Sequence, residues 1–183
     1  MDFCLTPQQV NELVALARQG APREICGVIG GRGSSASEIT PIANVAATPE
    51  RTYRMDEREL AQALTSQARR GLGPLAFYHS HPGGDPRPSA LDVTEWAYPD
   101  AVLLIIGLQP APALSAWTVR WGEVTPVELI IDTEPARAAR PAWTTAAQIA
   151  VLVAVIAAVA LLLVIAFSLL PPAPPIPATP MPR

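Results

Sequence analysis

The sequence contains no lysine, and all 13 of its positively charged side chains are arginines. A lysine nucleophile, a lysine Schiff base and the phosphate-binding lysine of a P-loop are therefore excluded. A formal net charge of −3 gives no sign of the basic patch that binds nucleic acid, so we expect no nucleic-acid partner. Two cysteines, Cys4 and Cys26, are too few for a disulfide framework and fit a reducing compartment. With only two histidines in the chain, their placement becomes informative.

The chain divides into a domain and an appendage. Its 183 residues suit one compact domain of about 100–150 residues plus a further segment. The stretch Ala146–Leu170 contains no charged residue. A helix of that length would measure about 37 Å, enough to cross a hydrocarbon core of about 30 Å. We predict a domain over 1–134, a linker over 135–145, a transmembrane helix over 146–170 and a proline-rich tail over 171–183.

The residues around the apolar segment predict its orientation. The first residues lack a basic region followed by an apolar one, so the sequence predicts no signal peptide. Two arginines, Arg137 and Arg140, lie just before the apolar segment, whereas only one positively charged residue, Arg183, follows it. By the positive-inside rule we expect a single-pass, tail-anchored membrane protein whose N-terminal domain faces the cytoplasm.

The hydrophobic pattern of residues 1–134 predicts a mixed α/β domain. Thr6 and Pro7 form a typical helix start, and helical spacing continues to Gly20. A second helix is expected from Asp56 to Arg70. Short apolar runs predict strands, two of them central and two nearer an edge. In chain order the expected strands are 25–29, 38–45, 75–78 (central), 101–106 (central), 117–120 (edge) and 127–131 (edge).

Both histidines, His79 and His81, directly follow a predicted strand. Residues two apart in extended backbone project to the same face, so the two imidazoles can reach one ion together. Residues 83–88 must be irregular because glycine and proline break ladders and helices, and Ser89 then opens a helix whose first turn includes Asp92. Two imidazoles and one carboxylate leave a fourth position for water, as in a catalytic zinc site. We therefore predict that His79, His81 and Asp92 bind one Zn²⁺.

Each half of this pattern has an ordinary explanation when taken alone. Serine followed three residues later by an acid is a common capping box, so Ser89 and Asp92 could simply start a helix. A histidine pair at the end of a strand is often a surface pair. The conjunction of the two halves, separated by a loop able to fold back, favours the metal site.

The spacing of these residues resembles the motif of the JAMM (MPN-domain) metalloenzyme family. That motif is an upstream Glu, then His-x-His, seven residues, Ser, two residues and Asp. Here His79, His81, Ser89 and Asp92 fit without departure, and Glu24 matches the upstream acid. The resemblance covers about residues 5–131, and the short loops are similar to the prokaryotic branch. It implies a mixed β-sheet flanked by helices, the arrangement also described as cytidine-deaminase-like.

The resemblance also implies a reaction. Glu24 would be the general base that moves a proton from zinc-bound water to the leaving amine, and Ser89 would direct its hydroxyl at the developing oxyanion. The substrate would be an amide or isopeptide bond after the C-terminal Gly-Gly of a ubiquitin-like or sulfur-carrier protein. Two alternatives stay open. One is a catalytically silent MPN-type scaffold tethered to the membrane, and the other is a zinc peptidase acting on small peptide or amino-acid conjugates.

Several weaker features receive ordinary interpretations. Gly31–Ala36 imitates a dinucleotide fingerprint, but no helix is predicted after it, so we expect a hairpin turn. Cys26 is interpreted as a small core residue, because a fourth protein ligand would close the zinc site. Trp96, Trp117 and Trp121 are expected in the core or on a face of the sheet.

Overall fold

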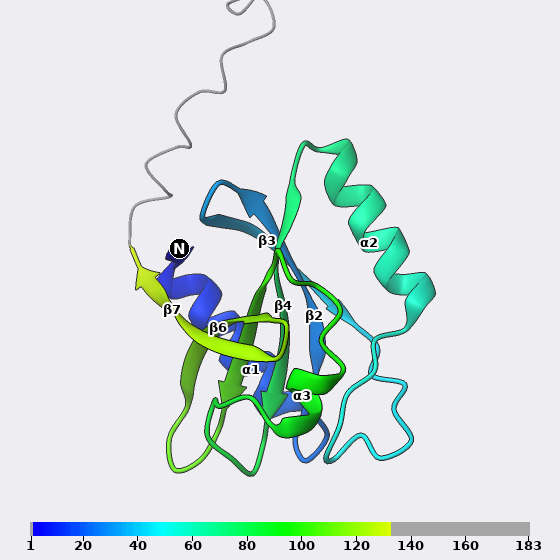
Figure 1. Ribbon diagram of the computed structural model, residues 1–183, viewed down its shortest axis with the longest axis vertical. Coiled ribbons are helices and arrows are strands. Elements are labelled where there is room, and N and C mark those ends of the chain that lie inside the picture. Colours follow the sequence, from blue (N-terminus) through cyan, green and yellow to red (C-terminus); the bar gives the residue numbers. More distant parts are fainter. Residues whose placement is uncertain (1, 133–183) are drawn as a thin grey trace, which may run out of the picture. The chain divides into compact units, whose positions relative to one another are not determined.

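The structure, a computed structural model, describes residues 2–132, which are drawn in colour in Figure 1. The predicted linker, transmembrane helix and proline-rich tail lie outside the described residues. Within residues 2–132, no helix is long and apolar enough to cross a membrane. The elements in chain order are β1 (Asp2–Leu5), α1 (Pro7–Gly20), β2 (Cys26–Arg32), β3 (Ser35–Ile42), α2 (Glu57–Arg69), β4 (Gly73–His81), α3 (Ala90–Thr94), β5 (Val102–Gly107), β6 (Ala113–Arg120) and β7 (Glu123–Ile131).

The first two helices begin where the sequence predicts. Thr6 Oγ1 accepts the Gln9 N–H at 3.2 Å, and Gln9 Oε1 accepts the Thr6 N–H at 2.8 Å, which is a capping box at the start of α1. Leu13 and Ala17, four residues apart on α1, are buried against the sheet. At the start of α2, the Asp56 side chain accepts a backbone N–H from the first turn.

Among the described residues, the strands form one closed sheet in the order β1-β3-β2-β4-β5-β6-β7. Strand β1 pairs in parallel with both β3 and β7, which closes the barrel. The prediction that 117–120 and 127–131 lie nearer an edge is therefore wrong. Strand β1 was not predicted because four residues are too few to show a period, although Phe3 and Leu5 are both buried.

Other boundaries differ less from the predictions. Strand β3 begins and ends a few residues earlier than 38–45, and it forms with β2 the hairpin predicted around Gly33. Strand β4 extends past 78 because β5 pairs with it as far as His81. Cys26 is buried in the core, whereas Trp121 is fully exposed. The expectation for Trp121 is wrong because this residue lies in the left-handed turn (φ 55°) that joins β6 to β7.

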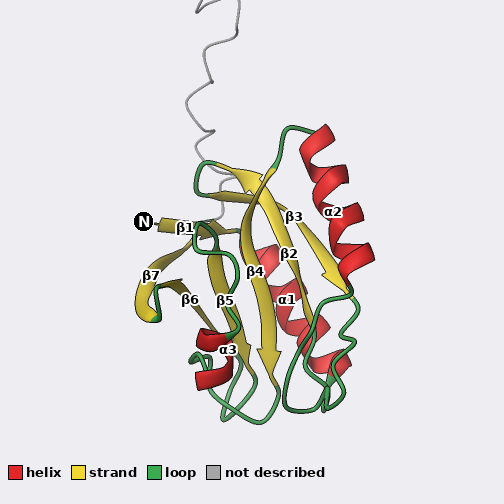
Figure 2. Ribbon diagram, turned by 45° about the vertical axis from the view of Figure 1, so that its right-hand side comes forward, coloured by secondary structure: helices red, strands yellow, loops and turns green. Residues whose placement is uncertain are grey.

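The alternation of side chains along β4 determines where the histidines project. Ala76 and Tyr78 pack in the cluster that includes α1, whereas Phe77 packs in the cluster that includes α2. The two helices therefore cover opposite faces of β2 and β4 (Figure 2). Because side chains alternate, His79 and His81 share the α2 face with Phe77. The short helix α3 and its neighbour Trp96 also pack on this face.

Candidate metal centre

The C-terminal end of β4 holds both histidines close together. His79 is fully buried and His81 is partly buried, and their Nε2 atoms lie 3.0 Å apart. On the neighbouring strands Cys26 and Ile105 flank His79. The extended backbone expected at the two histidines is part of β4, and it brings the two imidazoles to one point, as period-two geometry requires.

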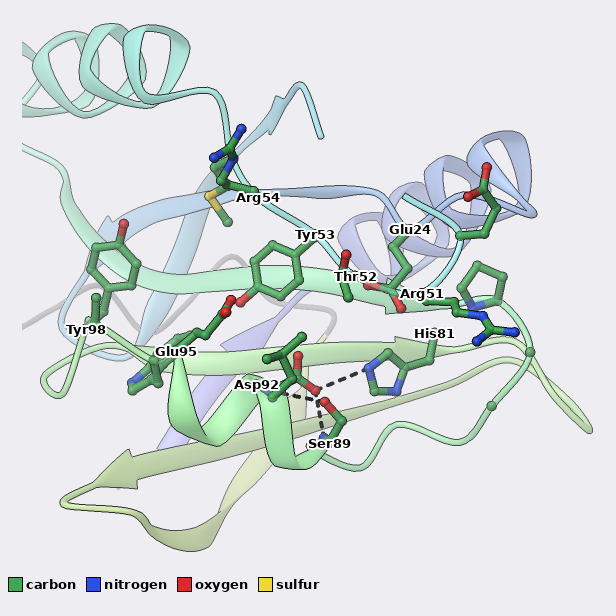
Figure 3. A pocket seen from close by; sticks show the side chains of 18 of the residues that line it. Glu24, Arg51, Thr52, Tyr53, Arg54, His81, Ser89, Asp92, Glu95 and Tyr98 are labelled. Atoms are coloured by element: carbon green, nitrogen blue, oxygen red, sulfur yellow. Dashed lines mark hydrogen bonds and ion pairs between the residues drawn. The ribbon is translucent and has the colours of Figure 1, made fainter. Parts of the chain in front are cut away.

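Asp92 comes from the first turn of α3 and completes the cluster. Figure 3 shows its side chain facing His81. Its Oδ1 lies 3.3 Å from His79 Nε2, and its Oδ2 lies 3.5 Å from His81 Nε2. Zinc ligands at about 2.0–2.1 Å in a tetrahedron are about 3.3–3.4 Å apart, so these separations fit a shared Zn²⁺. Within residues 2–132, this is the one group of three or more His, Cys, Asp or Glu side chains placed to hold a metal ion.

The electrostatics of the cluster favour the metal-binding forms of His79 and Asp92, whereas they favour the protonated form of His81. Burial is the largest influence on the pKa of His79 and lowers it, which keeps this imidazole neutral. Burial would raise the pKa of Asp92, but hydrogen bonds with both histidines outweigh it and hold that pKa well below its ordinary value. Burial lowers the pKa of His81, but contacts with Asp92 and the Asp85 carbonyl together raise it. The structure therefore presents an ionised carboxylate between the imidazoles.

A backbone carbonyl in the loop between the ligands orients His81. His81 Nδ1 lies 3.0 Å from Asp85 O, which assigns the Nδ1 hydrogen to that bond and leaves Nε2 for the metal. The loop is itself anchored, since Trp117 Nε1 donates to Pro86 O at 3.0 Å. Gly107, at the end of β5, packs directly against the peptide bond between Asp85 and Pro86. The sequence predicted an irregular loop here but did not indicate this support.

A methyl group at Gly107 is expected to disturb the metal centre. The Cβ of Gly107→Ala would lie 2.7 Å from Pro86 N and 2.8 Å from the carbonyl carbon of Asp85, so backbone must move. We expect Zn²⁺ affinity to fall about 10–100-fold, the usual cost of losing a partner that orients a ligand. The control is Gly73→Ala, because nothing lies within 4 Å of its added Cβ. Equal affinities of the two variants in a chelator competition would contradict this role of the loop.

Glu24 lies just before β2 and is buried, with 7% of its surface exposed. It lines one cavity of about 680 Å³ together with His81, Ser89 and Asp92 (Figure 3). Burial raises the pKa of Glu24 to about 7, and Asp92 adds to the rise while His81 opposes it. A carboxylate with such a pKa can both accept and release a proton near neutral pH.

Ser89 makes both hydrogen bonds of a capping box with Asp92. Its Oγ accepts the Asp92 N–H at 3.1 Å, and its N–H donates to Asp92 Oδ2 at 2.7 Å. Capping uses a lone pair of the hydroxyl and leaves its proton available for donation. The two roles expected for Ser89 are therefore compatible, and the ordinary explanation of this half of the motif is also correct.

Sequence reasoning missed two residues that support the site. The ring of Tyr53 stacks on that of His79, with centroids 4.3 Å apart and an interplanar angle of 19°. The amide of Asn44 connects the chain at Glu24 to the residues on either side of Tyr53. Both belong to the irregular segment before α2, where no spacing rule relates them to the histidines.

Asn44 uses its whole hydrogen-bonding capacity in this connection. Its Nδ2 donates to Glu24 O at 2.8 Å and to Thr52 O at 3.1 Å. Its Oδ1 accepts the N–H groups of Ala46 and Arg54, both at 3.0 Å. The wall of the cavity and the backbone of the candidate base are thus joined by one side chain.

The closed sheet and the His-His-Asp cluster are those of a JAB-type domain with a candidate metal site. Residues 6–120 match the family described as prokaryotic homologs of the JAB domain, and the chain belongs to this family. This confirms the predicted resemblance to the prokaryotic JAMM branch. A solved structure of a protein from Desulfitobacterium hafniense is 32% identical, has a TM-score of 0.67, and is matched over 74% of this chain and 97% of that one. The fold prediction is thereby confirmed for the described domain.

Relatives with curated names include enzymes. The chain is 36% identical over 115 residues to the "Desampylase" of Haloferax volcanii, covering 59% of this chain and 82% of that protein. It is 40% identical over 81 residues to a "Probable TtuB-protein conjugate cleaving protease" of Thermus thermophilus, covering 43% and 54%. It is 34% identical over 99 residues to the "CysO-cysteine peptidase" of Mycobacterium tuberculosis, covering 53% and 67%. These names support a hydrolase.

Proposed function

We propose that this chain is a zinc-dependent metallopeptidase that hydrolyses an amide or isopeptide bond. The observation that carries the proposal is the cluster of His79, His81 and Asp92, with 3.0–3.5 Å between the facing atoms. His81 and Asp92 line a cavity that Glu24 also lines. When bound there, Zn²⁺ would polarise the scissile carbonyl and lower the pKa of water toward 7.

The protein's own groups would move the protons. Glu24 would accept a proton from the water that adds to the carbonyl carbon and deliver it to the nitrogen as the C–N bond breaks. The Ser89 hydroxyl would donate to the carbonyl oxygen as negative charge develops there. The products are a carboxylic acid and an amine, so water is the co-reactant that the step consumes.

The proposed substrate is a conjugate of a ubiquitin-like or sulfur-carrier protein, cleaved after its C-terminal Gly-Gly. The names of the three relatives support this class, because they describe a desampylase, a protease for TtuB-protein conjugates and a CysO-cysteine peptidase. The last name also favours the second candidate, a peptidase for small amino-acid conjugates. A silent scaffold is less well supported, because every ligand of the motif is present and assembled.

Substitutions of Ser89 test the proposed reaction and separate catalysis from capping. Glycine is a good N-cap without a hydroxyl, so Ser89→Gly should keep α3 and still lose the donor. We expect kcat to fall about 100-fold in Ser89→Gly and Ser89→Ala, with Ser89→Thr retaining more activity. The assay is release of a reporter joined to the Gly-Gly end of a small ubiquitin-like protein, beside the same protein carrying one C-terminal amino acid. Wild-type turnover by Ser89→Gly would show that Ser89 serves only as a cap.

We further propose that the segment 146–170 anchors the protein in a membrane with the domain on the cytoplasmic side. The support is its uncharged sequence and the position of Arg137 and Arg140. A reporter fused after Arg183 should then react with an impermeant label from outside the cell. Labelling only after the membrane is opened would overturn the orientation.

A further inference from the structure

We propose that Tyr53 is a positioning residue for His79, fixing the plane of its imidazole so that Nε2 faces the metal. Stacking on Tyr53 would orient the His79 ring, as the hydrogen bond to the Asp85 carbonyl orients the His81 ring. This inference rests on the proposed metal site. It concerns how the site is held, which the family motif does not specify because Tyr53 lies outside that motif.

The two histidines are supported differently. His81 has the Asp85 carbonyl at its second nitrogen, at 3.0 Å. The Nδ1 of His79 is buried and has no hydrogen-bond partner among the described residues. Its neighbours across the sheet, Cys26 and Ile105, supply no strong acceptor. Metal-ligating histidines almost always use the second nitrogen to fix the ring, so His79 needs another support.

Tyr53 supplies that support through its ring. A histidine ring turns easily about its second side-chain torsion, which has broad and roughly two-fold minima. The Tyr53 ring, 4.3 Å away and inclined by only 19°, restricts this rotation by covering one face of His79. Asp92 Oδ1, 3.3 Å from Nε2, then selects which edge of the ring faces the site. Tyr53 thereby fixes the plane of the His79 ring, and Asp92 fixes which edge of that ring faces the site.

The backbone around Tyr53 is held firmly enough to act as a support. The Thr52 carbonyl accepts a hydrogen bond from the Asn44 side chain at 3.1 Å, and the Arg54 N–H donates one to it at 3.0 Å. Further along the segment, Met55 is buried and forms a β-bridge with Asn44. The Tyr53 ring also packs against the buried cluster beneath α2. A ring carried by such a segment does not move freely with the solvent-exposed loop before it.

The test compares the affinity of purified full-length variants for Zn²⁺, measured by competition with a chromophoric chelator. Tyr53→Phe keeps the ring and Tyr53→Leu removes it. The control is Tyr98→Leu, because Tyr98 stacks on Phe77 instead of a ligand, with ring centroids 3.7 Å apart. Tyr53 and Tyr98 line the same cavity, so both leucine variants remove an aromatic ring from its lining. Unfolding of each metal-free variant is measured in parallel.

We expect Tyr53→Leu to weaken Zn²⁺ binding about 10–100-fold, while Tyr53→Phe and Tyr98→Leu stay within about twofold of wild type. If Tyr53→Leu does not fold, Tyr53→Met takes its place, since a flexible side chain fills the space without a planar face. Wild-type affinity in the folded aliphatic variant, or an equal loss in Tyr53→Phe, would overturn the inference and leave the metal site standing. Failure of the wild-type protein to bind Zn²⁺ would instead overturn the proposed function.

Discussion

Glu24→Gln is expected to retain Zn²⁺ and lose about 10²–10⁴-fold in kcat, because the amide has nearly the same shape but cannot accept the proton. Glu24 is not needed to hold the ion, since the other three side chains converge without it. The measurement is reporter release at saturating substrate, with metal content determined on the same sample. The control is Glu50→Gln, which removes an exposed carboxylate from the wall of the same cavity.

The pH dependence of kcat/KM is a second test of Glu24 as the general base. The active form of Glu24 is the carboxylate, so kcat/KM should rise with pH as this group ionises. Its pKa is raised to about 7 by burial, and a bound divalent cation would lower it, so the rise should lie at or below about pH 7. Glu24→Gln should lack this limb. A variant that keeps both full turnover and the limb would show that another group is the base.

His81→Ala is expected to abolish stoichiometric Zn²⁺ binding. The site offers three protein ligands, and removal of one leaves only His79 and Asp92. Metal analysis of the wild-type protein should give about one Zn²⁺ per chain, and the variant should retain less than about a tenth of it.

A matched control for His81→Ala lies four residues further on, in the loop that follows β4. Asp85→Ala removes an exposed carboxylate that pairs with Arg87 and keeps the backbone carbonyl that contacts His81. It should therefore bind Zn²⁺ like the wild-type protein. Full zinc content in His81→Ala would exclude this side chain as a ligand and, with it, the proposed centre.

Local features of the fold could be predicted from sequence where residues act on near neighbours. The Thr6 cap and the hairpin near Gly33 depend on residues within a few positions of one another, and the structure has both. Closure of the barrel could not be predicted, since β1 joins β7 across more than a hundred residues. Nothing in four residues at one end of the domain specifies a partner near the other end.

In the candidate site, too, the residues related by short spacing could be predicted, whereas those that depend on tertiary contacts could not. His79 and His81 share a strand, and Asp92 follows within a short loop, so spacing alone brought the three ligands into one prediction. Tyr53 and Asn44 act on the site through packing and through hydrogen bonds to backbone. Those contacts depend on how the segment before α2 folds over β4, which no local pattern in that segment encodes.

The connection made by Asn44 has a consequence for the position of Glu24. The backbone N–H of Glu24 donates to Pro49 O at 2.7 Å, and its carbonyl accepts from Asn44, so the segment that contains Asn44 and Pro49 holds the backbone on both sides of the Glu24 Cα. Any change that moves this segment would therefore also move the backbone that carries the Glu24 carboxylate.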